Sequence, residues 1–111
     1  MHVEVSTDTR TTVDSPGIAT AIESGLARYR ERLTRVEVHL SDVNGPKGGR
    51  DARCALEARP AGMQPVAVTS DADTPEQAVK GAVEKMGRLL ETTFGRIDDV
   101  KGNTSASGLP T

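Results

Sequence analysis

The chain has 111 residues, a length typical of one domain with a single hydrophobic core. Hydrophobic residues make up 35% of it, and with one Tyr, one Phe and no Trp the core must be built from aliphatic side chains. A formal net charge of −2 excludes a uniformly basic surface, and a single cysteine excludes an internal disulfide and argues against a structural zinc site.

The charge is distributed unevenly along the chain. Residues 26–59 carry eight Lys or Arg against five Asp or Glu, whereas residues 1–25 carry one against four. The N-terminus lacks the basic and apolar stretches of a secretion signal, and no apolar run approaches the roughly 18 residues of a membrane span. We therefore expect a cytoplasmic protein with a basic middle and no membrane partner.

Two elements are expected in the first third of the chain. Residues 2–6 alternate between apolar and polar, which is the period of a half-buried strand. Ser15 followed by Pro16 predicts a helix start, and apolar residues then recur at helical spacing up to Leu33. The prediction is one helix over 16–33, weakened by Gly25.

Three further strands follow, over 35–40, over 53–59 and around Val66 and Val68. They are expected to form an antiparallel meander. The Gly-rich run from Asp42 to Asp51 between the first two predicts a mobile hairpin loop, and the basic residues of its 44–50 part leave two interpretations open, phosphate contact or a plain linker.

The last third predicts one long helix and a tail. Thr74, Pro75, Glu76 and Gln77 form a capping box with proline at the first helical position, and a broad apolar face runs on to Phe94. From Gly95 the pattern fades, and Gly102 to Thr111 is small, uncharged and rich in Ser, Thr and Gly. We expect a domain over 1–97 and a flexible polar tail over 98–111.

The predicted fold class is therefore α+β with the order β-α-β-β-β-α. A four-stranded sheet would have both helices packed on one face and the other face open to solvent.

The sequence offers little for catalysis. His2 lies at the N-terminus, His39 on the exposed side of its strand, and Cys54 on the inward side of its strand, where a free cysteine packs as a small hydrophobe. We predict no catalytic residue, metal, cofactor or small-molecule substrate. The open sheet face carries no aromatic residue, which also disfavours base stacking on the sheet.

Basic residues on the two helices are the remaining candidates for binding. Several of them lie three or four residues apart and would project together: Arg28, Arg30, Arg32, Lys80, Lys85 and Arg88. Such residues suit phosphate contacts that follow the shape of an RNA without reading its bases. The alternative is an ordinary solvated surface, since Glu31, Glu84 and Glu91 are interspersed.

Three segments carry a resemblance to a known family: ERLTRVEVHL (31–40), the strand pair ending in QPVAVTSDADTPEQAV (64–79), and VEKMGRLLE (83–91). Together with the element order, they resemble the hibernation-promoting factor and ribosome-associated inhibitor A family over roughly residues 2–96. Two features are characteristic of that family. The first is the run of Arg, an apolar residue, Thr and Arg (32–35) that leads into Val-Glu-Val (36–38), and the second is a Lys followed three places on by an Arg in the last helix.

That resemblance implies a domain similar to the double-stranded-RNA-binding fold, seated in the decoding region of the small ribosomal subunit. Carried over by position, Arg28, Arg32, Lys85 and Arg88 would contact rRNA phosphates. Relatives often continue with Lys or His where this chain has Thr92, Thr93 and Phe94. The tail is too short for the second domain of long members, which implies a short form.

The expected function is therefore a translation inhibitor or hibernation factor that occludes the decoding channel under stress or in stationary phase. The alternative is a protein-interaction module on the same fold that has lost strong RNA binding.

Overall fold

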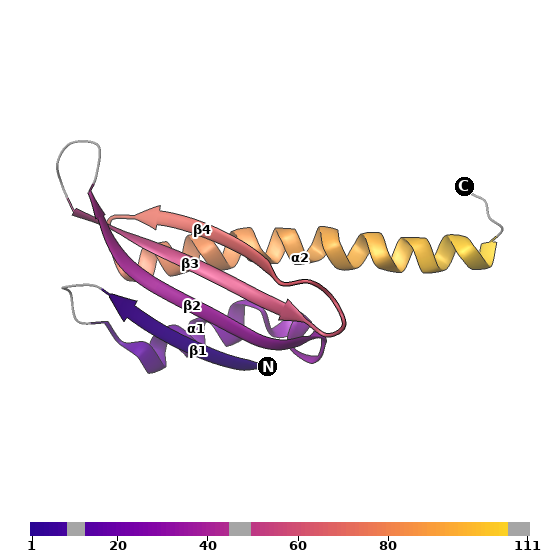
Figure 1. The fold of residues 1–111 in the computed structure, drawn as a ribbon, viewed down its shortest axis with the longest axis horizontal. Coiled ribbons are helices and arrows are strands. Elements are labelled where there is room, and N and C mark those ends of the chain that lie inside the picture. The colour runs from indigo at the N-terminus through magenta and orange to yellow at the C-terminus, as the bar shows by residue number, and fades with distance from the viewer. Residues whose placement is uncertain (9–12, 45–49, 107–111) are drawn as a thin grey trace.

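The computed structural model describes residues 1–8, 13–44 and 50–106. Its elements confirm the predicted α+β class and the order β-α-β-β-β-α, with a short 3₁₀ helix, η1, added (Figure 1). In chain order they are β1 (His2–Asp8), α1 (Ser15–Gly25), η1 (Ala27–Arg32), β2 (Leu33–Asn44), β3 (Arg50–Pro60), β4 (Val66–Ala72) and α2 (Pro75–Ala106).

The four strands form one sheet in the order β1-β2-β3-β4. β1 is parallel to β2, as its connection through a helix requires, whereas β2, β3 and β4 are antiparallel, which confirms the meander. The register places Val38 beside Val5 on one side and Leu56 on the other, and Leu56 beside Val68. One apolar row therefore crosses the whole sheet.

Both helices cover the same face of the sheet, with α1 against β1 and α2 against β3 and β4 (Figure 1). The core lies between these layers. Its largest fully buried side chains come from both helices and from β2 and β3: Ile22, Leu26, Leu40, Leu56, Met86, Leu90, Val36, Val38 and Cys54.

The prediction of one continuous helix over 16–33 is wrong. The α-helix ends at Gly25, and the chain continues as η1 over Ala27–Arg32. The break lies where α1 approaches α2, because a Cβ on Gly25 would overlap Cγ1 of Val83. The N-cap is also one residue earlier than predicted: the Asp14 carboxylate accepts a hydrogen bond from Gly17 N at 3.2 Å.

The start of α2 follows the prediction and its length does not. Thr74 Oγ1 accepts from Gln77 N at 3.2 Å, as a capping residue should. The helix then continues to Ala106, beyond the end of the sheet (Figure 1). Residues 98–106, expected in the tail, are helical, because backbone hydrogen bonds can extend a helix after its apolar pattern has ended. The domain boundary at 97 stays a prediction.

Candidate nucleic-acid interface

The three basic candidates on α2 lie on two different sides of the helix. Lys85 reaches β4, where its Nζ donates to the carbonyl oxygen of Thr69 at 2.7 Å. Lys80 instead lines a shallow groove between α1 and α2, together with Ala21 and Val83. At 3.6 residues per turn, positions 80 and 85 are about 140° apart around the helix. Lys80 therefore faces the groove beside α1, whereas Lys85 faces the edge of β4.

Lys80 has an acidic neighbourhood. Glu76 and Glu84 lie one helical turn before and after it, and both line the same groove. Their charges offset that of Lys80, so it is the α2 candidate least suited to binding a phosphate.

Four of the six candidates lie along α2 and the adjoining η1, on a path that turns about 120° around the helix between positions 85 and 91. Arg28 on η1 lies 3.9 Å from Glu91 on α2, measured from Nη1 to Oε2. Arg88 precedes Glu91 by three residues and Lys85 precedes Arg88 by three, so each lies one turn from the next. We call Arg28, Arg32, Lys85 and Arg88 the basic band. All four are exposed.

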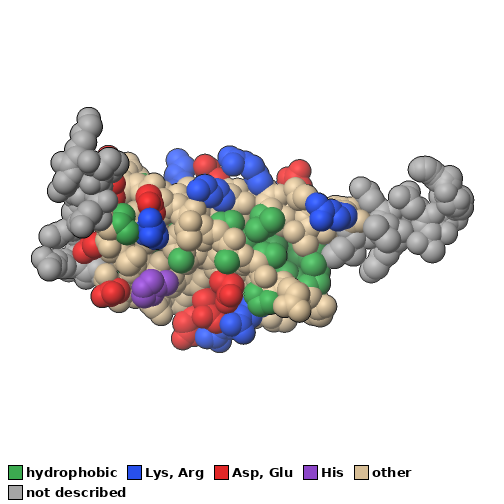
Figure 2. All heavy atoms as spheres, turned by 45° about the horizontal axis from the view of Figure 1, so that its top comes forward, with side chains coloured by type: hydrophobic (Ala, Val, Ile, Leu, Met, Phe, Trp, Pro, Cys, Tyr) green, Lys and Arg blue, Asp and Glu red, His purple; other side chains and the backbone are tan. Residues whose placement is uncertain are grey.

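The band runs through a mixed surface. Figure 2, which looks onto the open sheet face from the side of β4 and α2, shows Lys and Arg side chains along that edge with acidic side chains among them. Arg30, a further candidate, is exposed and makes no ion pair with the residues that the structure describes. Arg30 lies on η1, and no described contact joins its side chain to α2, so we leave it outside the basic band.

Lys85 also has a structural partner. β4 is an edge strand, and the Lys85 ammonium covers one of its backbone carbonyls, which blocks pairing with another strand at that point. A phosphate bound by Lys85 would share the ammonium with Thr69. Arg88 has no such tie among the described residues, so Arg88 is the cleaner position for testing RNA binding.

Two features of this region were missed in the sequence. Arg96 is exposed and continues the side of α2 that carries Lys85 and Arg88, and the spacing of 8 and 11 residues was the available signal. The other is a pair of aromatic rings under the η1 arginines. The Arg32 guanidinium carbon lies 3.9 Å from the centroid of Phe94, and that of Arg28 lies 5.0 Å from Tyr29.

The open face of the sheet is charged but not basic. Arg35 bonds to Glu4 at 3.0 Å and to Glu37 at 2.9 Å, and Arg59 lies 3.5 Å from Glu37. Hydrogen bonding by His2 and the nearby Arg35 lower the pKa of Glu4. Each arginine here is therefore neutralised by carboxylates, which leaves little positive charge for a phosphate.

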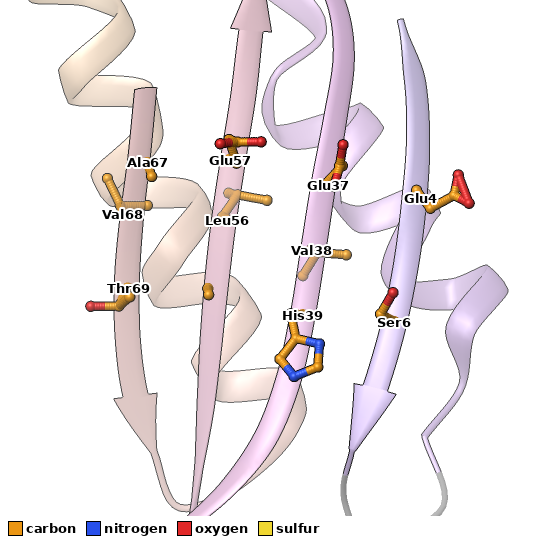
Figure 3. Close-up of a pocket in the computed structure, with 11 residues that line it drawn as sticks. Glu4, Ser6, Glu37, Val38, His39, Leu56, Glu57, Ala67, Val68 and Thr69 are labelled. Atoms are coloured by element: carbon orange, nitrogen blue, oxygen red, sulfur yellow. The ribbon is translucent and has the colours of Figure 1, made fainter. Parts of the chain in front are cut away.

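This face is also hollowed. A shallow depression of about 380 Å³ lies over β1–β4. Glu4, Glu37 and Glu57 form one row across it, and Ser6, His39 and Thr69 form the next (Figure 3). His39 projects from β2 at its edge, on the exposed side as predicted. The residues that line the depression include no Phe, Tyr or Trp, and the imidazole of His39 is the one ring among them. The depression therefore lacks the row of rings on which a base-stacking sheet depends.

The remaining chemistry-bearing side chains form no site within the described residues. Cys54 is fully buried, which confirms its predicted place in the core, and burial raises the pKa of its thiol to about 12. No three His, Cys, Asp or Glu of the described chain lie close enough to hold a metal. In the same ranges, no helix has both the length and the apolar character of a membrane span. The prediction of a loop over 42–51 is wrong at both ends, because 42–44 belong to β2 and 50–51 to β3, and 45–49 lie outside the described residues.

Fold and surface together define a small α+β domain with a basic band on its helical side and an ion-paired, hollow sheet face. No protein-family model matches the chain, and no curated protein matches its sequence. Among solved structures, the chain is similar to the N-terminal domain of Protein Y from Thermus thermophilus, with a TM-score of 0.59 and 20% identity. The match covers 84% of this chain and 99% of that one. At this identity the likeness shows a shared fold.

Proposed function

We propose that this protein binds structured RNA of the small ribosomal subunit and inhibits translation by occupying the decoding channel. The basic band carries the proposal. Its four residues are the ones that the family resemblance matched, all four are exposed, and Arg28 of η1 lies beside Glu91 of α2 although the two segments are far apart in the sequence. The fold shared with the Protein Y domain agrees with the fold that the resemblance implies. A cytoplasmic location belongs to the same proposal.

The mechanism is occlusion, and it needs no catalytic step. Arginine and lysine side chains donate charge-assisted hydrogen bonds to phosphate oxygens and release counterions from the RNA. For about four contacts, the slope of log affinity against log salt is roughly −3 to −4. Raising the salt from about 50 to 200 mM would then weaken binding on the order of 100-fold.

The test is co-sedimentation of the protein with purified small ribosomal subunits across a salt series, with a matched pair of variants. Arg88→Glu lies in the band, and Lys80→Glu lies on the same helix outside it. Both side chains are exposed and both changes alter the charge equally. Arg88→Glu should lower the affinity about ten-fold and reduce the salt slope by about 1, whereas Lys80→Glu should have little effect.

Two results would contradict the proposal. An equal loss of affinity in both variants would mean that binding depends on the net charge of the protein and not on the residues of the basic band. No sedimentation of the parent protein with subunits even at low salt would exclude ribosome binding altogether.

The second candidate function is a protein-interaction module, and the hollow, ion-paired sheet face is the observation that favours it. Lys85→Glu combined with Arg88→Glu separates the two candidates. An RNA binder loses ribosome association, whereas a protein adaptor keeps its partner. The melting temperature of the double variant must be measured as well, because Lys85 also bonds to β4.

A further inference from the structure

At the junction of η1 and α2, two arginines lie on two aromatic rings. Tyr29 and Phe94 are nine-tenths or more buried, and their ring centroids are 5.4 Å apart with a tilt of 40°. Arg32 lies over Phe94 and Arg28 over Tyr29. The chain has no other Tyr, Phe or Trp, so all of its aromatic surface is at this junction.

The 3₁₀ geometry of η1 explains the arrangement. In a 3₁₀ helix, side chains three residues apart lie directly above one another, which places Arg32 above Tyr29. Phe94 then arrives from α2 beneath the Arg32 guanidinium. A guanidinium at 3.9 Å from a ring is held by cation–π attraction, so its orientation is set by a buried group although the side chain is exposed.

A small hollow adjoins these groups. Its volume is about 290 Å³, at the lower end of the range for small-ligand sites, and Arg28, Arg32, Glu91 and Gly95 line it beside the two rings. Glu91 lies 3.9 Å from Arg28 and is 69% exposed. Its carboxylate lowers the positive charge inside the hollow and can accept hydrogen bonds from a base, which presents donors on its edge.

We infer that this junction, the arginine–aromatic site, binds one unpaired nucleotide of an RNA by stacking its base on the Arg32 guanidinium. The inference rests on the proposed RNA binding and adds to it a preference for stems that carry an unpaired nucleotide. The basic band holds the phosphates of a helical stem, and the site accepts a base that projects from that stem. Unpaired bases stack on guanidinium planes in this way, whereas a continuous duplex offers none.

The experiment compares two RNA stems of identical sequence, one of which carries a single unpaired nucleotide. The parent protein should bind the stem with the unpaired nucleotide about ten-fold more tightly, the size of one stacked base. Arg32→Lys keeps the charge and removes the planar group. It should bring the ratio of the two affinities close to one, and because both RNAs are measured with the same variant, the ratio is independent of any change in the affinity for the plain stem.

Tyr29→Phe is the matched control, because it keeps the ring beneath Arg28 and should keep the ratio. A second readout uses 2-aminopurine as the unpaired base, and its fluorescence should change on binding of the parent protein and not on binding of Arg32→Lys.

A ratio of one for the parent, or an unchanged ratio in Arg32→Lys, overturns the inference and leaves salt-dependent stem and ribosome binding intact. No binding to either stem at low salt overturns the proposed function as well.

Discussion

The contact between Gly25 and Val83 predicts a change of stability opposite to the one expected from helix propensity. Replacing Gly by Ala inside a helix normally stabilises it by up to about 1 kcal/mol. Here the new Cβ would overlap a methyl of a stiff β-branched side chain, and overpacking of this kind costs about 1–3 kcal/mol. Gly25 ends α1, so the propensity gain is small. We expect Gly25→Ala to lower the free energy of unfolding by about 1–2 kcal/mol.

The measurement is urea unfolding followed by far-UV circular dichroism, together with a thermal melt. The expected loss corresponds to a melting temperature lower by about 4–8 °C. Val83→Ala removes the obstructing methyl, so Gly25→Ala should cost about 1 kcal/mol less in that background. Two results would refute the close approach of α1 to α2: a Gly25→Ala protein as stable as the parent, or a double variant whose loss of stability equals the sum of the losses of Gly25→Ala and Val83→Ala.

Three further predictions concern single side chains. The Cys54 thiol should react slowly with a thiol reagent at pH 8 and rapidly in urea, because burial raises its pKa to about 12. Fast labelling of the folded protein would contradict this burial. Asp71 accepts two hydrogen bonds from Arg53, at 2.8 and 3.1 Å, which lower its pKa. Asp71→Asn should therefore destabilise the protein at neutral pH, by an amount that disappears as the pH falls below about 4, and a pH series of urea midpoints checks it. Tyr29→Phe should leave the free energy of unfolding unchanged or raise it by up to about 1 kcal/mol, since the buried hydroxyl has no hydrogen-bond partner in the described chain. A clear loss of stability in chemical denaturation would show that the hydroxyl has a partner.

The elements of this fold could be predicted from local patterns because their signals are local. Alternation with a period of two located the strands, and a capping Thr followed by Pro located the start of α2. The extent of η1 and α2 could not be predicted in this way. Where α1 stops depends on the approach of Val83, which is far away in the sequence, and α2 continues past its last core residue.

The candidate interface was only partly predictable. Helical spacing identified which basic residues are exposed, but it could not show that α2 presents Lys80 and Lys85 to different neighbours. The aromatic support of Arg32 was also missed, because Phe94 follows it by 62 positions and both rings had the spacing of ordinary core residues.

By itself, the sequence determined the class of fold, the order of its elements, the inward and outward faces of each strand and the absence of aromatic residues from the open sheet face. These follow from hydrophobic periodicity, which every segment carries without reference to the others. Only the tertiary structure decided that Arg28 lies beside Glu91 of α2, that Lys80 and Lys85 face different neighbours, and that two arginines of η1 lie on aromatic rings. Those relations depend on how α1, η1 and α2 pack against one another, and packing is set by close contacts between residues distant in the chain.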